Sequence, residues 1–268
     1  MASVFIALLL FSVPAQGASP ERIVSLAPNV TEILFSLGLG DRIVGVSNFC
    51  DRPAEAKNRA KVGAIKDPSL ESILSLKPDL VVIDRDVNPD GIGERLAKLG
   101  VKVHIFSAFR IRELPPAVRA LGKASGKQKE AETLARRLEK SFREIGNKGK
   151  QRKRAVFILL PEPLVVAGAE TPIDDAMNLL GMENVAAGSA ARYPRYSLEG
   201  LIAAKPEIIF IGKGHADMRR ASEGFLKKIA MIPAVRAGRV YFLGDGLFRM
   251  GPRIEEGLRE MSVAAQGR

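Results

Sequence analysis

The sequence contains no tryptophan, one cysteine and two histidines among 268 residues. A single cysteine, Cys50, excludes a disulfide within the chain and a thiolate metal cluster. His104 and His215 are far apart and no HExxH motif is present, which excludes that class of zinc site. With 3 tyrosines and 12 phenylalanines, few aromatic side chains are available to hold a flat ligand.

Beyond the N-terminus the chain lacks an apolar run of the roughly 20 residues that cross a bilayer. The apolar run at residues 4–13 has the length of a signal-peptide core, and Ala15 and Gly17 supply the small residues of a cleavage site. We therefore expect residues 1–19 to be a signal peptide for export to a bacterial periplasm. The segment before the run has no Lys or Arg, so a truncated start is an alternative. No cysteine follows the run, so no lipid anchor is expected.

Acidic residues are fewer than basic ones, and the formal net charge is +11. Such a balance can indicate nucleic acid, a membrane surface or an anionic ligand as the partner. The densest basic group, at residues 148–154, has neither zinc-finger spacing nor an aromatic RNA-binding signature beside it. We interpret it as a solvated connector and expect no nucleic-acid partner. The hydrophobic content of 46% is sufficient for a folded core.

The first part of the chain alternates short apolar runs with amphipathic segments. Buried strands that alternate with helices are typical of a parallel sheet covered by helices. Strands are predicted at residues 22–27, 43–47, 81–84 and 101–106, and helices at residues 29–37, 69–77 and 91–99. Asn29 is the predicted N-cap of the first helix. These elements predict an N-terminal α/β lobe over residues 20–125.

The alternation stops at residues 113–145, which are predicted to be helical with interruptions at Gly122 and Gly126. An apolar stripe that includes Leu134 and Leu138 indicates one long amphipathic helix, expected over residues 126–149. A second α/β lobe is expected over residues 150–268. Its strands are predicted at residues 155–160, 208–211 and 240–243, and its helices at residues 174–180, 222–231 and 252–264. The predicted fold is α/β, with two Rossmann-like lobes on parallel sheets joined by a single long interlobe helix.

Two stretches repeat one another: SLESILSLKPDLVVID from Ser69 and SLEGLIAAKPEIIFIG from Ser197. Each predicts a helix that leads into a buried strand at an equivalent place in its lobe. Ser69 and Ser197 are predicted N-caps, and the helix dipole favours Glu71 and Glu199 in the first turn. The alternative is chance recurrence of a helix, a Lys-Pro-acid turn and a strand.

Five segments together resemble the periplasmic binding proteins that serve ABC importers of vitamin B12, ferric siderophores and haem. The segments are RIVSLAPNVTEILFSLGLGDRIVGVSNFCDRP, KVGAIKDPSLESILSLKPDLVV, GAETPIDDAMNLLGMENVAAG, YPRYSLEGLIAAKPEIIFI and DGLFRMGPRIEEGL. The resemblance covers about residues 22–261. Through NFCDRP, YPRYSLE and RMGPRI the chain resembles the corrinoid-binding branch in particular.

The resemblance implies a solute-binding protein that captures a corrinoid, such as cobalamin or cobinamide, between its lobes and delivers it to an ABC importer. A ferric siderophore or haem is the alternative cargo. The resemblance also implies a monomer that has no catalytic residues, no resident cofactor and no metal site. Glu71 and Glu199 would dock onto arginine pockets of the two subunits of a dimeric permease in the inner membrane.

The resemblance places the ligand in the interlobe cleft, where loops follow the carboxyl ends of the strands. It assigns ligand contacts to Pro28, Asn29, Phe49, Arg85, Arg110, Leu164, Tyr193, Arg195, His215, Asp245 and Arg249. Asp84 and Phe109 are further candidates. On a short helical turn, the four-residue spacing of Asp245 and Arg249 would let them orient each other. The alternatives are core positions for Phe49 and Phe109, solvated loop charges for Arg85 and Arg110, and an axial metal ligand for His215.

The absence of tryptophan is a departure from relatives that bind vitamin B12, which use tryptophan in the cleft. The corresponding positions hold Ala64 or Ile65, Asp84 and Tyr193. An arginine-rich cleft with few aromatics also suits an anionic ferric siderophore, because guanidinium groups pair well with anionic oxygens.

The sequence disfavours two other classes of function. An α/β enzyme is disfavoured because GxGxxG, P-loop and GxSxG motifs are absent, and the glycines at positions 38 and 40 end a helix. A metal-ion receptor of similar architecture would need several His, Asp or Glu ligands to replace the water around the ion, and two histidines argue against one.

Overall fold

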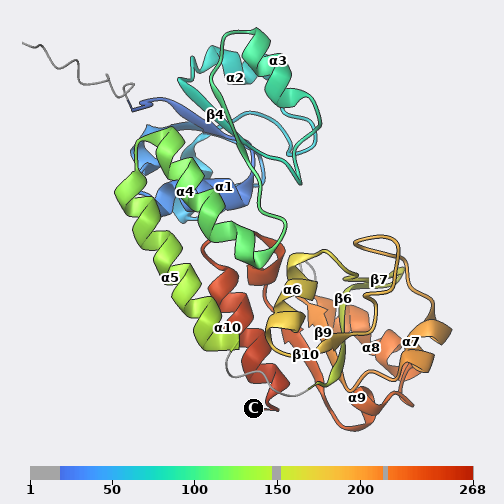
Figure 1. Cartoon of the computed structure of the whole chain (residues 1–268). Helices are drawn as coiled ribbons and strands as arrows, with labels where there is room; N and C mark the ends of the chain where they lie inside the picture. The colour runs from blue at the N-terminus through green and yellow to red at the C-terminus, as the bar shows by residue number, and fades with distance from the viewer. Residues whose placement is uncertain (1–18, 147–151, 214–216, 268) are drawn as a thin grey trace, which may run out of the picture.

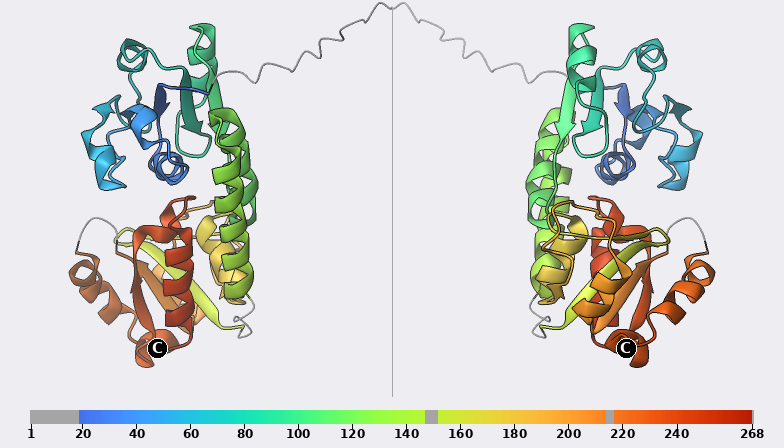
Figure 2. Two further views of the ribbon diagram at one scale, coloured as in Figure 1. Left: turned by 90° about the vertical axis from the view of Figure 1, so that its left-hand side faces the viewer. Right: turned by 90° about the vertical axis from the view of Figure 1, so that its right-hand side faces the viewer.

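Two α/β lobes lie one above the other in the computed structural model, with a pair of long helices along one side (Figures 1 and 2). The structure describes residues 19–146, 152–213 and 217–267. Apart from Ser19, the expected signal peptide lies outside the described residues. No described helix is both long enough and apolar enough to cross a membrane.

The N-terminal lobe is built on a five-stranded parallel sheet with the order β3-β2-β1-β4-β5. Its strands are β1 (Ile23–Ser25), β2 (Ile43–Val46), β3 (Ala60–Lys61), β4 (Leu80–Asp84) and β5 (Val103–Phe106). Its helices are α1 (Pro28–Ser36), α2 (Leu70–Ser75), α3 (Ile92–Lys98) and the short turns η1 (Gly40–Arg42) and η2 (Ala54–Asn58). The chain adds strands to one side of β1 and then crosses to the other, so β1 and β4 flank the point where the strand order reverses.

The C-terminal lobe has a second five-stranded sheet with the order β10-β9-β6-β7, and β8 also pairs with β6. Its strands are β6 (Arg154–Pro161), β7 (Leu164–Val166), β8 (Glu183–Asn184), β9 (Ile208–Gly212) and β10 (Val240–Leu243). β7 is antiparallel to β6, whereas the other described strand pairs of this sheet are parallel. Its helical elements are α6 (Pro172–Leu179), α7 (Leu198–Ala204), α8 (Met218–Lys228), α9 (Pro233–Arg236), η4 (Asp245–Phe248) and α10 (Ile254–Ala265). The predicted α/β class with two lobes is confirmed.

The link between the lobes consists of η3 (Ile111–Glu113), α4 (Leu114–Ser125) and α5 (Gln128–Gly146). The expected interlobe helix is α5, and α4 packs antiparallel along it (Figure 1). Arg119 of α4 donates from Nε to Glu132 at 2.7 Å and from Nη1 to Glu139 at 2.6 Å, both on α5. The apolar stripe of α5 belongs to one core that includes buried residues of both lobes. These contacts stiffen the connection along its length.

The repeated stretches adopt the same local structure. Ser69 Oγ accepts from the backbone N–H of Ser72 at 3.1 Å, and Ser197 Oγ accepts from that of Gly200 at 2.9 Å. Both predicted N-caps are therefore confirmed. The lysines that end the two helices, Lys77 and Lys205, share a left-handed φ of 45°.

The acidic residue of each Lys-Pro-acid turn has a structural role. The Asp79 carboxylate accepts from the backbone N–H of Glu21 and Arg22, immediately before β1. The Glu207 carboxylate accepts from the N–H of Arg154 at the start of β6. Each acid ties its helix–strand unit to the neighbouring strand of its own sheet. The shared pattern favours the architectural explanation of the repeat over chance.

Gly122 does not interrupt the helical segment, contrary to the sequence prediction. Gly126, with φ of 75°, ends α4, whereas Gly122 lies buried inside it. A Cβ atom at Gly122 would lie 2.2 Å from Cβ of Ala131 and 2.9 Å from the carbonyl oxygen of Lys127. The glycine is therefore required by the close approach of α4 and α5.

Gly122→Ala is expected to lower the free energy of unfolding by about 1–3 kcal/mol, the usual cost of overpacking a core. Gly224→Ala is the matched control, because position 224 lies inside α8 with no atom within 4 Å of the added Cβ. There the higher helix propensity of alanine should stabilise the protein by about 0.5–1 kcal/mol. Urea denaturation of both variants tests the pair. Equal effects at the two positions would contradict the close-approach explanation.

Candidate functional site

A chamber lies between the lobes, at the carboxyl ends of the parallel strands. We call it the inner chamber, and its volume is about 250 Å³. It is lined by Pro28, Asn29, Phe49, Ile65, Asp84, Asp86, Val87, Ala108, Pro172, Tyr193, Phe248, Arg249 and Met250. The first eight follow strands of the N-terminal lobe, and the others come from the C-terminal lobe, so neither lobe forms the chamber alone.

The floor of the inner chamber is the point where the strand order of the first sheet reverses. Asn29 follows β1 and Asp84 ends β4, and Nδ2 of Asn29 donates to Oδ2 of Asp84 at 2.6 Å. Asn29 also reaches the carbonyl of Met250 in the other lobe at 3.3 Å. The prediction of Asn29 as an N-cap is wrong, because Pro28 already occupies the first turn and Ala27 is the cap residue.

Asp84 is a buried carboxyl at the edge of the chamber, with only 5% of its surface exposed. Burial raises its pKa, although the hydrogen bond from Asn29 acts in the opposite direction. Its Oδ1 accepts from the backbone N–H of Asp86 at 2.7 Å. Asn88 accepts from the N–H of Asp84 and donates to the carbonyls of Leu26 and Ile65. This network holds three loops of the N-terminal lobe in fixed positions around the carboxyl.

Aromatic side chains line the chamber from both lobes. Phe49, Tyr193 and Phe248 are 56%, 43% and 37% exposed, which are high values for large apolar residues. Phe49 is therefore not a core residue, contrary to the alternative considered from the sequence. Phe248 packs edge-on against Phe157, with 5.7 Å between ring centroids. These faces offer a flat ligand apolar contact on two sides.

Arg249 joins the lobes at one end of the inner chamber. Its Nη1 donates to Oε1 of Glu32 at 2.9 Å and to Oδ1 of Asp51 at 2.8 Å. We call these three residues the Arg249 clasp. Burial raises the pKa of Glu32 despite the contact with Arg249. Burial acts to raise the pKa of Asp51 as well, but the hydrogen bond and charge of Arg249 outweigh it, and that pKa is lowered.

Asp245 does not orient Arg249, so this expectation is wrong. Asp245 instead accepts two hydrogen bonds from Arg253, at 2.7 and 3.2 Å, and its pKa is lowered as a result. The reason is local geometry. Residues 245–248 form a 3₁₀ turn and Arg249 is extended, so a spacing of four does not place the two side chains on one helical face.

Two more arginines bridge the lobes. Arg192 pairs with Asp86 and donates from Nε to the carbonyl of Glu170, and its guanidinium lies 5.5 Å from the ring centroid of Phe109. Arg110 donates to Asp175 on α6 at 3.0 Å. Arg110 is therefore not a solvated loop charge. Arg192 and Arg110 are therefore both paired with acids of the protein itself.

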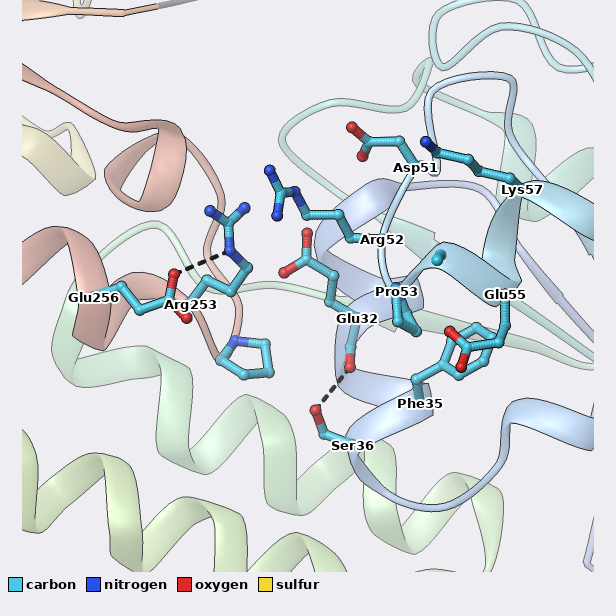
Figure 3. Close-up of a pocket in the computed structure, with 12 residues that line it drawn as sticks. Glu32, Phe35, Ser36, Asp51, Arg52, Pro53, Glu55, Lys57, Arg253 and Glu256 are labelled. Atoms are coloured by element: carbon cyan, nitrogen blue, oxygen red, sulfur yellow. Dashed lines mark hydrogen bonds and ion pairs between the residues drawn. The ribbon is translucent and has the colours of Figure 1, made fainter.

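A second cavity lies beyond the Arg249 clasp. We call this cavity of about 770 Å³ the outer chamber. Its lining residues are Glu32, Phe35, Ser36, Asp51, Arg52, Pro53, Ala54, Glu55, Lys57, Pro252, Arg253 and Glu256 (Figure 3). The clasp residues Glu32 and Asp51 line it, while Arg249 lines the inner chamber, so the clasp separates the two cavities.

Several residues assigned to the ligand lie outside the inner chamber. Arg85 is exposed on the loop after β4. Leu164 lies in β7 and packs against the core of its sheet, and Arg195 forms a β-bridge with Val165. Asp245 belongs with Arg253, and His215 lies outside the described residues. His104 lies in β5 and lines neither chamber.

Of the assigned contacts, Pro28, Asn29, Phe49, Tyr193 and Arg249 line the inner chamber. Sequence reasoning missed Asp86, Phe248 and Met250, although each follows a predicted strand and the strand-end rule would have included them. Glu32, Asp51 and Arg192 were missed because only contacts across the cleft reveal their roles. Among residues 19–146, 152–213 and 217–267, no cluster of three His, Cys, Asp or Glu could hold a metal ion.

The chain is similar to known proteins over most of its length. A family model described as periplasmic binding protein matches residues 23–247. A vitamin B12-binding protein of Pectobacterium atrosepticum is 30% identical over 247 residues, with 90% of this chain and 86% of the relative covered.

Solved structures agree with this similarity. The periplasmic vitamin B12-binding protein of Vibrio cholerae superimposes with a TM-score of 0.81 at 26% identity, covering 92% of this chain and 97% of that one. A periplasmic haem-binding protein from Roseiflexus sp. RS-1 gives a TM-score of 0.79 at 29% identity, covering 91% and 97%. The chain therefore belongs to the periplasmic binding protein family.

Proposed function

We propose that the protein captures a corrinoid in the interlobe cleft and delivers it to an ABC importer. The observation that carries the choice of ligand is the chemistry of the inner chamber. Asp84 lines it without an arginine or lysine partner in the described part of the chain, whereas Asp86 is paired with Arg192, and the single basic lining residue described, Arg249, is paired with two carboxylates. A corrinoid presents a rim of amide N–H donors and an apolar ring, which complement carboxylates and aromatic faces.

This chamber is a poor match for anionic cargo. Haem presents carboxylates and many ferric siderophores are anionic, so both would meet the carboxyl of Asp84, which has no arginine or lysine partner in the described part of the chain. The arginine-rich cleft considered from the sequence is not available, because Arg110, Arg192 and Arg249 pair with acids of the protein. For a corrinoid, by contrast, each hydrogen bond from an amide N–H to a charged carboxylate would contribute about 1.5–3 kcal/mol to binding.

The size of the chamber implies that the cleft widens for this ligand. Sites for drug-sized ligands usually enclose about 300–1,000 Å³, and the inner chamber encloses about 250 Å³. A corrinoid therefore requires that the side chains of the Arg249 clasp and the Arg192–Asp86 pair move apart. Because α4 and α5 are held together by Arg119, we expect the lobes to rotate only slightly.

Export and delivery are parts of the same proposal. Residues 1–19 direct the chain to the periplasm, where it acts as a monomer without a resident cofactor and without turning over its ligand. Glu71 and Glu199 then dock onto a dimeric permease. The repeated helices support this, because one exposed acid in an equivalent first turn of each lobe suits a two-fold symmetric partner.

A thermal-shift screen of the purified protein tests the choice of ligand. Cobalamin and cobinamide should raise the melting temperature, since a ligand at 100 times its Kd stabilises the fold by about 2.7 kcal/mol. Haemin and anionic ferric siderophores should not.

Tyr193→Ala should weaken corrinoid binding about tenfold by calorimetry, in line with the loss of an aromatic contact. Met231→Ala, which removes an exposed apolar side chain outside both chambers, should have no effect.

A haem or ferric-chelate receptor is the second candidate. The similarity to a haem-binding protein at 29% identity favours it. Stabilisation by haemin or a ferric siderophore, with no response to either corrinoid, would replace the first proposal.

A further inference from the structure

The outer chamber has the features of a second ligand subsite, and its most buried polar group is Glu32. The Glu32 side chain is 5% exposed and its Oε1 accepts from Arg249. Its Oε2 is buried and has no hydrogen-bond partner among the residues that the structure describes. Burial without a partner is unfavourable for a carboxylate oxygen, so this atom is suited to accept a hydrogen bond from a ligand.

Arg52 and Lys57 are the lining cations of this chamber that have no ion pair in the described part of the chain, and Arg52 is the one with a guanidinium. Arg253 is paired with Asp245 and Glu256, and Arg249 with Glu32 and Asp51. Arg52 has no ion pair or side-chain hydrogen bond with any residue in the described part of the chain. Figure 3 shows its guanidinium extending toward that of Arg253, with the Glu32 carboxyl directed toward the same part of the chamber.

The guanidinium of Arg52 and Oε2 of Glu32 define the chemistry of a ligand for the outer chamber. A guanidinium binds a phosphate through two parallel hydrogen bonds, and a buried carboxylate oxygen beside it accepts from a hydroxyl. A ligand group that carries both a phosphodiester and a neighbouring sugar hydroxyl meets both requirements. The nucleotide loop of a complete corrinoid has this composition.

The positions of the two chambers also favour a single ligand that occupies both of them. The outer chamber adjoins the inner one at the Arg249 clasp, and its volume of about 770 Å³ greatly exceeds the 250 Å³ of the inner one. The amide rim and ring suit the acidic, aromatic inner chamber, whereas the anionic loop suits the side where Arg52 lies. A ligand that separates the clasp residues gains access to both.

We propose that the outer chamber is the subsite for the nucleotide loop of a complete corrinoid, in which Arg52 binds the phosphodiester and Oε2 of Glu32 accepts from the ribose hydroxyl. This inference rests on the proposed function, since it concerns one part of that ligand. It makes Arg52 a residue that distinguishes complete corrinoids from those without the loop.

Calorimetry with cobalamin and cobinamide tests the proposal, because cobinamide lacks the nucleotide loop. We expect Arg52→Ala in the full chain to weaken cobalamin binding about tenfold, the effect of losing a hydrogen bond to a charged group, and to leave cobinamide binding within about twofold. Arg52→Lys should recover part of the loss. Arg85→Ala is the matched control, since Arg85 is an exposed arginine of the same lobe that lines neither chamber.

Salt dependence provides a second readout. Raising the ionic strength should weaken cobalamin binding to the wild type more than cobinamide binding, and Arg52→Ala should remove that difference. Arg52 is exposed, so the variant should melt at the wild-type temperature. An equal loss for both ligands, or no loss for either, would overturn the subsite while leaving the corrinoid function intact. Failure of the wild type to bind either corrinoid would overturn the function itself and this subsite with it.

Discussion

Replacing both Glu71 and Glu199 by arginine is expected to abolish ligand transport while ligand binding stays at the wild-type level. Both carboxylates are exposed, in the first turns of α2 and α7, and neither lines a chamber. If they meet arginines of a permease, the double variant places like charges against each other at two sites. Such juxtaposition costs several kcal/mol, so affinity for the importer should fall at least about 100-fold. Transport in reconstituted vesicles and calorimetry with ligand measure the two properties separately.

A matched charge reversal separates docking from a general change in charge. Glu94 in α3 and Glu223 in α8 are also exposed acids on helices, one on each lobe. Glu94→Arg with Glu223→Arg gives the same change in net charge and should leave transport intact. In the docking variant, an arginine near each helix N-terminus should reduce stability by only about 0.3–1 kcal/mol per site. Normal transport by the Glu71/Glu199 variant would remove the docking role, and equal losses in both double variants would point to overall charge.

Arg249→Ala is expected to lower the free energy of unfolding by about 3 kcal/mol at neutral pH. The substitution leaves Glu32, 5% exposed, without its counter-ion, and breaking a buried ion pair from one side costs about 3–5 kcal/mol. We take the lower value because Asp51, the other partner, is 42% exposed and can be solvated. Chemical denaturation of the variant and the wild type measures the difference.

The stability deficit of Arg249→Ala should depend on pH. Burial raises the pKa of Glu32 above its ordinary value of 4.5 even with Arg249 present, and the groups nearby are Asp51, Arg52, Asp245 and Arg253. Removing Arg249 raises the pKa of Glu32 further. When the pKa of Glu32 is higher in the folded than in the unfolded state, the stabilising contribution of Glu32 is fully present at pH values below its unfolded-state pKa. That contribution is lost as the pH rises through its folded-state pKa. The deficit should therefore shrink as the pH is lowered toward 4.5.

Neutralising Glu32 in the same background is the control. In the Glu32→Gln/Arg249→Ala double variant the uncompensated charge is gone, so most of the lost stability should return and the pH dependence of the deficit should disappear. Two results would contradict this explanation. One is an Arg249→Ala variant as stable as the wild type at neutral pH, and the other is a stability deficit of that variant that does not change between pH 7 and pH 5.

Much of the fold was predictable because its signals are local. Alternating buried strands and helices, Gly126 at the end of α4, and Ser69 and Ser197 as N-caps each depend on residues a few positions apart. Gly122 was misread for the same reason. A glycine inside a helix resembles a break, and only the 2.2 Å approach of α5 explains why it is there.

The site was predictable only in part. The rule that ligands bind at the carboxyl ends of parallel strands predicted the place of the cleft. The resemblance to the binding-protein family supplied its residues, of which Pro28, Asn29, Phe49 and Asp84 in one lobe and Tyr193 and Arg249 in the other line the inner chamber. It could not predict which charges pair, because Arg249 and Glu32 are 217 positions apart and meet only when the lobes are placed. The four-residue spacing of Asp245 and Arg249 failed because the turn that contains them is 3₁₀ rather than α-helical.

The sequence by itself determined the two-lobed α/β architecture, the internal repeat and the edge of the sheets at which the cleft lies, since these follow from periodicity, caps and strand ends. Only the tertiary structure decided that the arginines of the cleft are already bound to carboxylates, that acids and aromatics line the inner chamber, and that the Arg249 clasp separates it from the outer one. The physical reason is that the strength and partner of a charge depend on burial and on distances of about 3 Å between atoms, and both are set by how the lobes pack against each other along α4 and α5.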